Sequence, residues 1–364
     1  MKIQKNGCEI EKFIVSRDDS IYQAWPDVAL TASGRLVCVF CECTHHMDRS
    51  YSRINYAISD DRGRTWAEKR ALSTPLRTAT KKDPHWNCPR ITALSDGRLV
   101  VIVDRVGGLR EGTDSEQSNW LWFSSDNGDS WSGPIAMPMR GVVPDRIIEL
   151  GAAPHRGRWI ASAHIPAFEP GGIWRQQVWF SDDKGQTWHG PHTAAAHPDL
   201  KLCEGSIVEM PKGELVCFLR ENSGLGLDAF HSISRDGGLT WTDVEKFPLP
   251  GCHRPVGGLL QSGHALITYR FIQGGNNVTR GWVTQNFFAA LTDVESCLAP
   301  DRASARARIL PLDFDRSPVA DLGYSGWVQF PDGEIYIVYY IVDDAPKGHI
   351  RGISMREDAF YIRA

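Results

Sequence analysis

The sequence has no long apolar run and no excess of charge of one sign. No stretch approaches the roughly 20 apolar residues that cross a bilayer, and the first residues, MKIQKNGCEIEKF, contain no apolar signal core. Lys and Arg number 40 against 44 Asp and Glu, so no global basic field favours nucleic acid. These absences predict a protein with neither a nucleic-acid nor a membrane partner, and they leave the oligomeric state open.

Helical patterns are also scarce. Amphipathic stretches long enough for a helix are hard to find, whereas alternating runs such as RLVCVF, RLVVIV and EIYIVYY recur along the chain. With 13 Trp, 34 Gly and 21 Pro, the composition favours short strands and tight turns. We therefore expect an all-β protein.

The nine cysteines are odd in number and irregularly spaced, so they do not form a disulfide framework. Reduced thiols in the cytoplasm are the simplest interpretation, and a secreted protein whose leader has been removed is the alternative. The run Cys41 to His46 (CECTHH) has metal-binding residue types but no partner set at zinc-site spacing. We interpret it as strand cysteines followed by loop histidines, and expect no metal or organic cofactor.

Two repeats divide the chain into units. The first, S-x-D-x-G-x-[ST]-W, starts at Ser59, Ser124, Ser181 and Ser234, at spacings of 65, 57 and 53 residues. Its Asp can accept backbone N–H groups, its Gly tolerates a positive φ, and its Trp can fold back as an apolar plug. One copy would be a weak signal, but four copies predict a repeated hairpin loop.

The second repeat is a hairpin whose turn contains a glycine between two apolar strands. The turn glycines are Gly34, Gly97, Gly157, Gly213, Gly263 and Gly333. Six units of about four strands each predict a six-bladed β-propeller with four-stranded antiparallel blades, in which residues 1–364 form a single domain. We expect the segment from Glu11 to Ser16 to complete the last blade and close the ring.

With these boxes, the chain resembles the sialidase superfamily of Asp-box, or BNR-repeat, propellers over essentially its whole length. The box itself is a folding device, so any site must lie elsewhere. In a propeller hairpin, a residue nine before the turn glycine lies near one seven after it, at one mouth of the central channel. Each mouth position therefore recurs once per blade.

These positions are rich in charge. The positions before the turn glycine are Trp25, Cys88, Pro144, Glu204, Arg254 and Tyr324. For blade three the count starts from Leu150, because its turn is longer. Two residues further on, the first three blades carry Asp27, Arg90 and Arg146. The later positions are Cys41, Asp104, His164, Arg220, Arg270 and Tyr340. Buried charges need partners or water, so the rings predict a wet mouth, and the arginines favour an anionic ligand such as an acidic sugar.

Several of these side chains are therefore predicted to bind the sugar. We expect the glycan to contact Asp27, Arg90, Asp104, Arg146, His164 and Arg254. For any single arginine, a salt bridge between neighbouring blades is an equally good interpretation.

Glu204 and Tyr324 hold the same register in blades four and six. A carboxylate beside a phenol can take its proton and make it a nucleophile, which is the arrangement of sialidases rather than of carboxylate-pair glycosidases. The segment CEGSIVEMPKGELVCFLR looks like the family segment that carries the Glu, and its end supplies Arg220 as an arginine for the substrate carboxylate. The segment GYSGWVQFPDGEIYIVYY looks like the one that carries the Tyr.

The resemblance implies two further residues. The family's acid/base is an Asp on the loop after the second strand of blade one, and Asp48 is its match, with a solvated loop Asp as the alternative. A further family arginine follows the second strand of blade five, where Arg280 matches by position and Arg270 is the alternative.

One departure bears on the substrate. Family members carry Arg-Ile-Pro in blade one, where this chain has Ala24-Trp25-Pro26. The chain is thus expected to be a retaining, sialidase-like exo-glycoside hydrolase acting on a terminal, acidic sugar, with sialic acid itself in question. The alternatives are a non-catalytic glycan-binding propeller and another sugar-modifying enzyme, such as a lyase, on the same scaffold.

Overall fold

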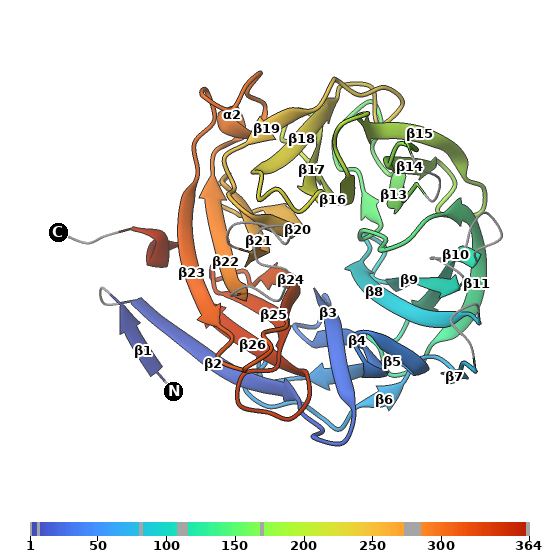
Figure 1. Ribbon diagram of the computed structural model, residues 1–364, viewed down its shortest axis with the longest axis vertical. Coiled ribbons are helices and arrows are strands. Elements are labelled where there is room, and N and C mark those ends of the chain that lie inside the picture. The colour runs from blue at the N-terminus through green and yellow to red at the C-terminus, as the bar shows by residue number, and fades with distance from the viewer. Residues whose placement is uncertain are drawn as a thin grey trace.

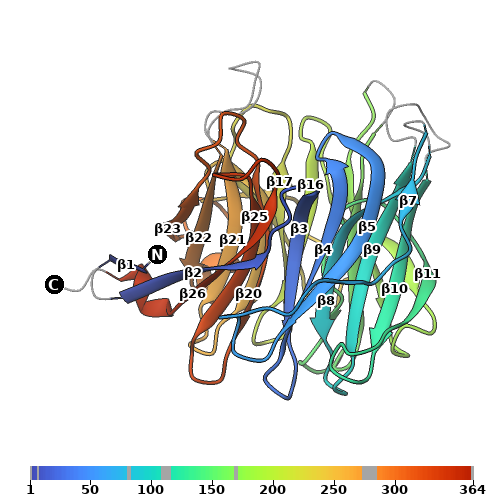
Figure 2. The same ribbon diagram turned by 90° about the horizontal axis from the view of Figure 1, so that it is seen from below.

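The structure is a computed structural model that describes residues 2–5, 8–79, 83–107, 116–167, 171–272 and 285–361. Six antiparallel sheets stand around a central axis as the blades of a propeller (Figure 1). The strands run roughly along that axis, so their connecting loops gather at the two ends of the ring (Figure 2). The predicted all-β, six-bladed fold is therefore confirmed.

Within each blade the strands succeed one another from the axis outward. Blade one contains β3 (Tyr22–Leu30), β4 (Leu36–His45), β5 (Asp48–Ser59) and β6 (Arg70–Ala71), with β7 (Leu76–Arg77) also on β5. Blade two contains β8 (His85–Ala93), β9 (Leu99–Gly107), β10 (Glu116–Ser124) and β11 (Ser132–Arg140). Blade three contains β12 (Ile148–Glu149), β13 (Trp159–Ile165), β14 (Arg175–Ser181) and β15 (His189–Ala196).

Blade four contains β16 (Leu202–Glu209), β17 (Leu215–Glu221), β18 (Ala229–Ser234) and β19 (Glu245–Phe247). Blade five contains β20 (Cys252–Leu259), β21 (Ala265–Ile272), β22 (Gln285–Thr292) and β23 (Arg308–Phe314). Blade six contains β24 (Leu322–Gln329), β25 (Ile335–Ile341), β26 (His349–Met355), β2 (Cys8–Ser16) and β1 (Lys2–Lys5). The short helices α2 (Val294–Cys297) and η1 (Glu357–Phe360) complete the described secondary structure.

The ring closes as predicted. Strand β2 pairs antiparallel with β26, with Glu11 opposite Ser354 and Ile14 opposite Arg351. Both ribbon views show blue β2 running beside red β26 (Figures 1 and 2). One blade is thus built from segments near opposite ends of the sequence, which leaves no gap between the first and last units.

Each Asp box forms the expected loop. In the first, Asp61 accepts the backbone N–H of Thr65 at 2.9 Å and Ser59 accepts that of Gly63 at 2.8 Å. Gly63 has φ +80, and Trp66 donates its ring N–H to the Gly63 carbonyl at 3.2 Å. The six predicted turn glycines also have positive φ, between 86 and 93°. Both repeats therefore act through local backbone geometry.

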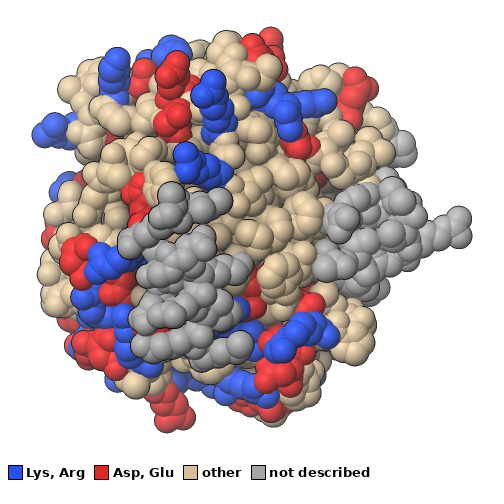
Figure 3. All heavy atoms as spheres, turned by 90° about the vertical axis from the view of Figure 1, so that its left-hand side faces the viewer, with Lys and Arg blue, Asp and Glu red and all other residues tan. Residues whose placement is uncertain are grey.

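Apolar side chains fill the spaces between blades. One buried cluster joins Phe40 of blade one, Val101 of blade two and Tyr336 of blade six. On the outer surface, Lys and Arg are intermixed with Asp and Glu over the face shown in Figure 3. Among the described residues, no helix is long and apolar enough to cross a membrane.

Candidate active site

A break in the pairing of the innermost strand with its neighbour recurs in five of the six blades near one mouth of the channel. The β3–β4 register skips between Ala24 and Asp27, and corresponding breaks occur in blades two, four, five and six. At the breaks of blades one, four, five and six, one residue has a positive φ: Trp25 (53°), Glu204 (51°), Arg254 (50°) and Tyr324 (41°). Val143 (51°), which precedes the blade-three strands, has one as well, whereas the blade-two break has none. This conformation costs a non-glycine residue about 1–2 kcal/mol. Its repetition in several blades therefore indicates that the orientation of these side chains is retained despite the backbone strain.

The blade-three position was miscounted from the sequence by one residue. Val143, rather than Pro144, has the positive φ, and His164 bridges the neighbouring Val142 instead of extending a regular ladder. The long turn before Gly157 obscured the register there.

Glu204 and Tyr324 meet at the centre of this mouth. The phenol of Tyr324 donates to Oε1 of Glu204 at 2.5 Å. Nη1 of Arg220 donates to both oxygens of Glu204, at 2.9 and 3.0 Å, and lies 3.5 Å from the Tyr324 oxygen. The shared register expected from the sequence thus brings a carboxylate, a phenol and a guanidinium into one hydrogen-bonded group.

The protonation states of this pair follow from their surroundings. Burial would raise the pKa of Glu204, but the charge of Arg220 and the Tyr324 hydrogen bond outweigh it and lower that pKa to about 2. Burial and then the charge of Glu204 raise the pKa of Tyr324 well above that of a free phenol. At neutral pH the pair therefore consists of a carboxylate and a protonated phenol, with the proton already directed at its acceptor.

Arg270 lies beside Tyr324, and His164 lies beside Glu204. The guanidinium carbon of Arg270 lies 5.3 Å from the centre of the Tyr324 ring. Nδ1 of His164 lies 3.4 Å from the Glu204 backbone nitrogen, and Trp174 stacks on the His164 ring at 5.7 Å between centres. Burial lowers the pKa of His164 to about 4, so its imidazole is neutral and can accept that N–H.

Asp321, a buried carboxylate that sequence reasoning missed, lies close to Arg270. Asp321 accepts hydrogen bonds from Tyr22 and from Tyr340, the latter at 2.7 Å. His46 Nδ1 lies 2.6 Å from the same carboxylate, and Arg270 Nη1 lies 3.9 Å from it. Asp321 precedes β24 and falls outside the counted rings, so no register argument could have found it.

Trp25 and Arg49 form a second unforeseen feature. The Arg49 guanidinium carbon lies 3.8 Å above the centre of the Trp25 ring, and Nη1 of Arg49 lies 3.4 Å from Cys43 Sγ. Trp25 also contacts His46 and Tyr340 edge to face, at 5.3 and 6.1 Å between ring centres. Blade one therefore contributes a stacked aromatic–guanidinium pair where the family pattern has an arginine.

Three predicted ligand-binding residues are instead paired with one another below the mouth. Asp27, which is 0 % exposed, accepts hydrogen bonds from Nε of Arg146 at 2.8 Å and lies 3.4 Å from Nε of Arg90. Arg90, 1 % exposed, also donates to the Ser325 carbonyl at 2.8 Å. These contacts join blades one, two, three and six, so the inter-blade interpretation fits Asp27, Arg90 and Arg146.

Arg254 and Asp104 have similar structural contacts. Arg254 is 0 % exposed, donates to the Pro144 carbonyl at 2.8 Å and lies 3.8 Å from Asp145. Asp104 accepts the backbone N–H groups of Cys88 and Val143, both at 2.8 Å. Burial raises the pKa of Asp104. The ring count placed both side chains at the mouth, but it could not show that neighbouring strands cover them.

The predicted acid/base lies at the edge of the site. Asp48 is exposed at the tip of the β4–β5 hairpin, and its carboxylate accepts the Ser50 backbone N–H at 2.9 Å, which lowers its pKa. No contact joins it to Tyr324 or Glu204 among the described residues, so its role stays a prediction. Arg280 lies outside the described residues.

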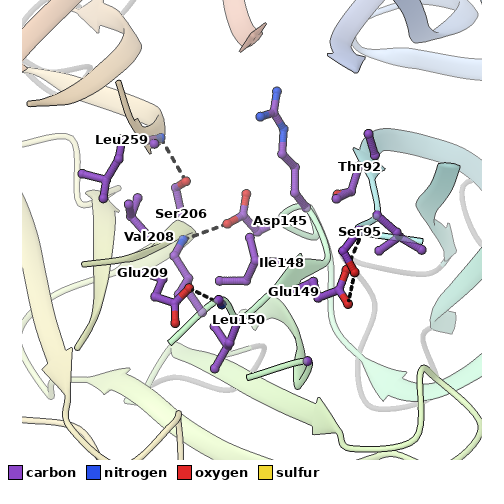
Figure 4. A pocket seen from close by; sticks show the side chains of 18 of the residues that line it. Thr92, Ser95, Asp145, Ile148, Glu149, Leu150, Ser206, Val208, Glu209 and Leu259 are labelled. Atoms are coloured by element: carbon purple, nitrogen blue, oxygen red, sulfur yellow. Dashed lines mark hydrogen bonds between the residues drawn. The ribbon is translucent and has the colours of Figure 1, made fainter. Parts of the chain in front are cut away.

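A separate cavity of about 830 Å³ opens at the other end of the channel. Its lining, seen in Figure 4, includes Glu149 and Glu209, which bind the backbone N–H groups of Ser95 and Gly151 at 2.8 and 2.7 Å. These acidic groups brace loops on the turn-glycine end, away from Glu204 and Tyr324. The cavity therefore contributes no reactive group to the site.

Comparisons with known proteins agree with this architecture. A sialidase of Paraclostridium sordellii is 24% identical over 319 residues, which cover 80% of this chain and 74% of that protein. A sialidase of Micromonospora viridifaciens is 29% identical over 206 residues, 51% of this chain but only 30% of the relative's length. A crystal structure of a Dyadobacter fermentans protein of unknown function superposes with a TM-score of 0.78 at 22% identity, covering 95% of this chain and 99% of that one.

The family model described as BNR repeat-like domain matches residues 53–271. Since this match extends over more than half of the chain and the four boxes lie in the predicted blades, the protein belongs to the BNR repeat-like family of sialidase-like β-propellers.

Proposed function

We propose that this protein is a glycoside hydrolase that releases a terminal, acidic sugar with retention at the anomeric carbon. The observation that carries the proposal is the 2.5 Å hydrogen bond from Tyr324 to Glu204, with Arg220 fixed on the same carboxylate. A buried phenol directed at a carboxylate of low pKa is poised to lose its proton only when its oxygen gains a new bond.

The reaction would proceed in two steps. First, the Tyr324 oxygen attacks the anomeric carbon as its proton passes to Glu204, and the bond to the leaving oxygen breaks with a proton from Asp48, which must enter this step in its carboxylic-acid form. Water then attacks the same carbon, the tyrosine–sugar bond breaks, and the proton on Glu204 returns to Tyr324. Asp48 takes the proton of the water, so the enzyme ends in its starting state.

A phenol suits an acidic substrate. A carboxylate nucleophile would be repelled by a carboxylate attached to the reacting carbon, whereas the neutral phenol of Tyr324 is not. Arg220 and Arg270 both lie beside Tyr324 and would favour the developing phenolate as well as a negatively charged sugar. The sialidase names of two relatives, at 24% and 29% identity, support a sugar of this class.

The test is turnover of 4-methylumbelliferyl glycosides of sialic acid, its deaminated analogue, glucuronic acid and neutral sugars. We expect one acidic glycoside to be hydrolysed and Tyr324→Phe to lower kcat by at least roughly a thousandfold, since removal of a nucleophile has effects of this size. The matched control is Tyr269→Phe, because Tyr269 is fully buried and its hydroxyl has no hydrogen-bond partner among the described residues. Turnover retained by Tyr324→Phe would remove the nucleophile assignment.

A glycan-binding propeller without catalysis is the second candidate, and the observation that favours it is Trp25 in place of the family's first-blade arginine. This function predicts sugar binding without turnover of any glycoside. It also predicts binding that survives the simultaneous loss of Glu204 and Tyr324.

A further inference from the structure

The charges around the mouth are unevenly paired. Arg220 is bonded to Glu204 at 2.9 Å, and Arg270 lies 3.9 Å from Asp321. Arg49 has no carboxylate within ion-pair distance among the described residues, since its side-chain contacts are the Trp25 ring and the Cys43 sulfur. Three guanidinium groups therefore face two carboxylates, and the uncompensated positive charge lies on Arg49.

Neighbouring groups do not neutralise Arg49. The preceding carboxylate, Asp48, is turned to the Ser50 backbone N–H instead. On the adjacent blade, burial and then the charge of Arg49 lower the pKa of His85 to about 4, so this imidazole adds neither an anion nor a second cation. A partly buried guanidinium without a counter-ion is costly, and an anionic ligand would offset that cost.

The geometry of Arg49 is suited to such a ligand. The Trp25 ring at 3.8 Å covers one face of the guanidinium and fixes its plane. A guanidinium has five N–H donors, of which one is directed at Cys43, so its edge retains the two parallel donors that a carboxylate accepts. The pair starts from Trp25, which has the same positive-φ position in blade one that Glu204 and Tyr324 have in theirs.

We propose that Arg49, held flat on Trp25, is the residue that selects an acidic ligand by binding its carboxylate. The inference rests on the proposed function only in placing a sugar at this mouth. In blade one the residue that binds the ligand carboxylate would then be Arg49 of strand β5, and Trp25 would position the Arg49 guanidinium.

The experiment measures binding of free sialic acid and free glucuronic acid, each beside its uncharged methyl ester, by titration calorimetry on the intact protein. Arg49→Ala is expected to weaken binding of an acid by roughly tenfold or more, because a charge-assisted contact is lost, while ester binding stays unchanged. Arg49→Lys keeps the charge but loses the planar pair of donors, so its affinity for the acid is expected to lie between those of the parent and of Arg49→Ala. Arg53→Ala is the matched control on the same strand, since Arg53 already pairs with Glu42 at 3.3 Å.

Equal loss for acid and ester in Arg49→Ala, or no preference for acid over ester in the parent, would overturn the inference. Failure of the parent to bind either acid at millimolar concentration would overturn it as well. Unchanged melting curves for the variants show that the comparison concerns folded protein. Acid preference that depends on Arg49, without turnover of any glycoside, would retain this inference and remove the hydrolase proposal. Tyr324-dependent turnover of an acidic glycoside, with acid binding unchanged in Arg49→Ala, would retain the hydrolase proposal and remove this inference.

Discussion

Replacing Asp27 with asparagine tests whether buried charges near the axis hold the blades together. In the folded protein this carboxylate accepts Nε of Arg146 at 2.8 Å and the backbone N–H of Ile91 at 3.0 Å, and it is 0 % exposed. Asparagine keeps the volume but removes the charge, which leaves Arg90 and Arg146 without their shared counter-ion. Breaking a buried ion pair in this way costs about 3–5 kcal/mol, a large part of the roughly 5–15 kcal/mol by which proteins are stable.

The assay is thermal unfolding followed by tryptophan fluorescence and by circular dichroism. A loss of this size corresponds to a fall in Tm of roughly 4–7 °C for a chain of 364 residues. Asp19→Asn is the control, because Asp19 pairs with Arg17 at 2.8 Å on the exposed surface, and we expect no measurable change. A Tm shift for Asp27→Asn no larger than that of the control would refute the structural role assigned to these three residues.

Two further predictions concern acidity and backbone geometry. Burial lowers the pKa of four histidines, His85, His164, His231 and His349, to about 4, against about 6.5 in an unfolded chain. The unfolded state therefore binds more protons between these values, so the stability is fully present above about pH 6.5 and declines as the pH falls towards 4; a Tm that stays flat over this range would contradict the neutral, buried state. Gly63→Ala is expected to lower Tm far more than Gly34→Ala, because its new Cβ would lie 2.2 Å from Tyr336, whereas that of Gly34 meets nothing within 4 Å. Both have a positive φ, near 80 and 87°, so equal Tm shifts would show that the close approach of Tyr336 is unimportant.

The parts of the structure that follow from short-range rules were predictable. A turn that needs a positive φ selects glycine, and the Asp box carries its own hydrogen-bond partners, so both repeats mark blades without knowledge of distant contacts. Strand alternation then fixes which residues face the axis. The meeting of Glu204 and Tyr324, 120 residues apart, follows from register alone.

The burial of the inward-facing residues and the direction of long side chains could not be predicted from such short-range rules. Asp27 and Arg90 are at inward positions, as counted, but only the packed blades show that they meet each other rather than solvent. Arg49 follows a hairpin turn, and the course of its long side chain over Trp25 depends on where blade one stands relative to its neighbours. Asp321 lies in a connection outside the repeat, where no period applies.

The pairing of β2 with β26 has a consequence for folding during synthesis, because blade six cannot be completed until β26 has been made. During synthesis, residues 8–16 leave the ribosome more than 300 residues before their partner strand, His349–Met355. Until then the growing chain carries an unsatisfied strand edge, which is a known route to aggregation and swapping between chains. Glu204 of blade four is made long before Tyr324, which lies in blade six together with β26 and β2. The hydrogen-bonded pair of Glu204 and Tyr324 therefore forms only as the ring is completed, because a chain that stops before blade six has Glu204 but lacks Tyr324.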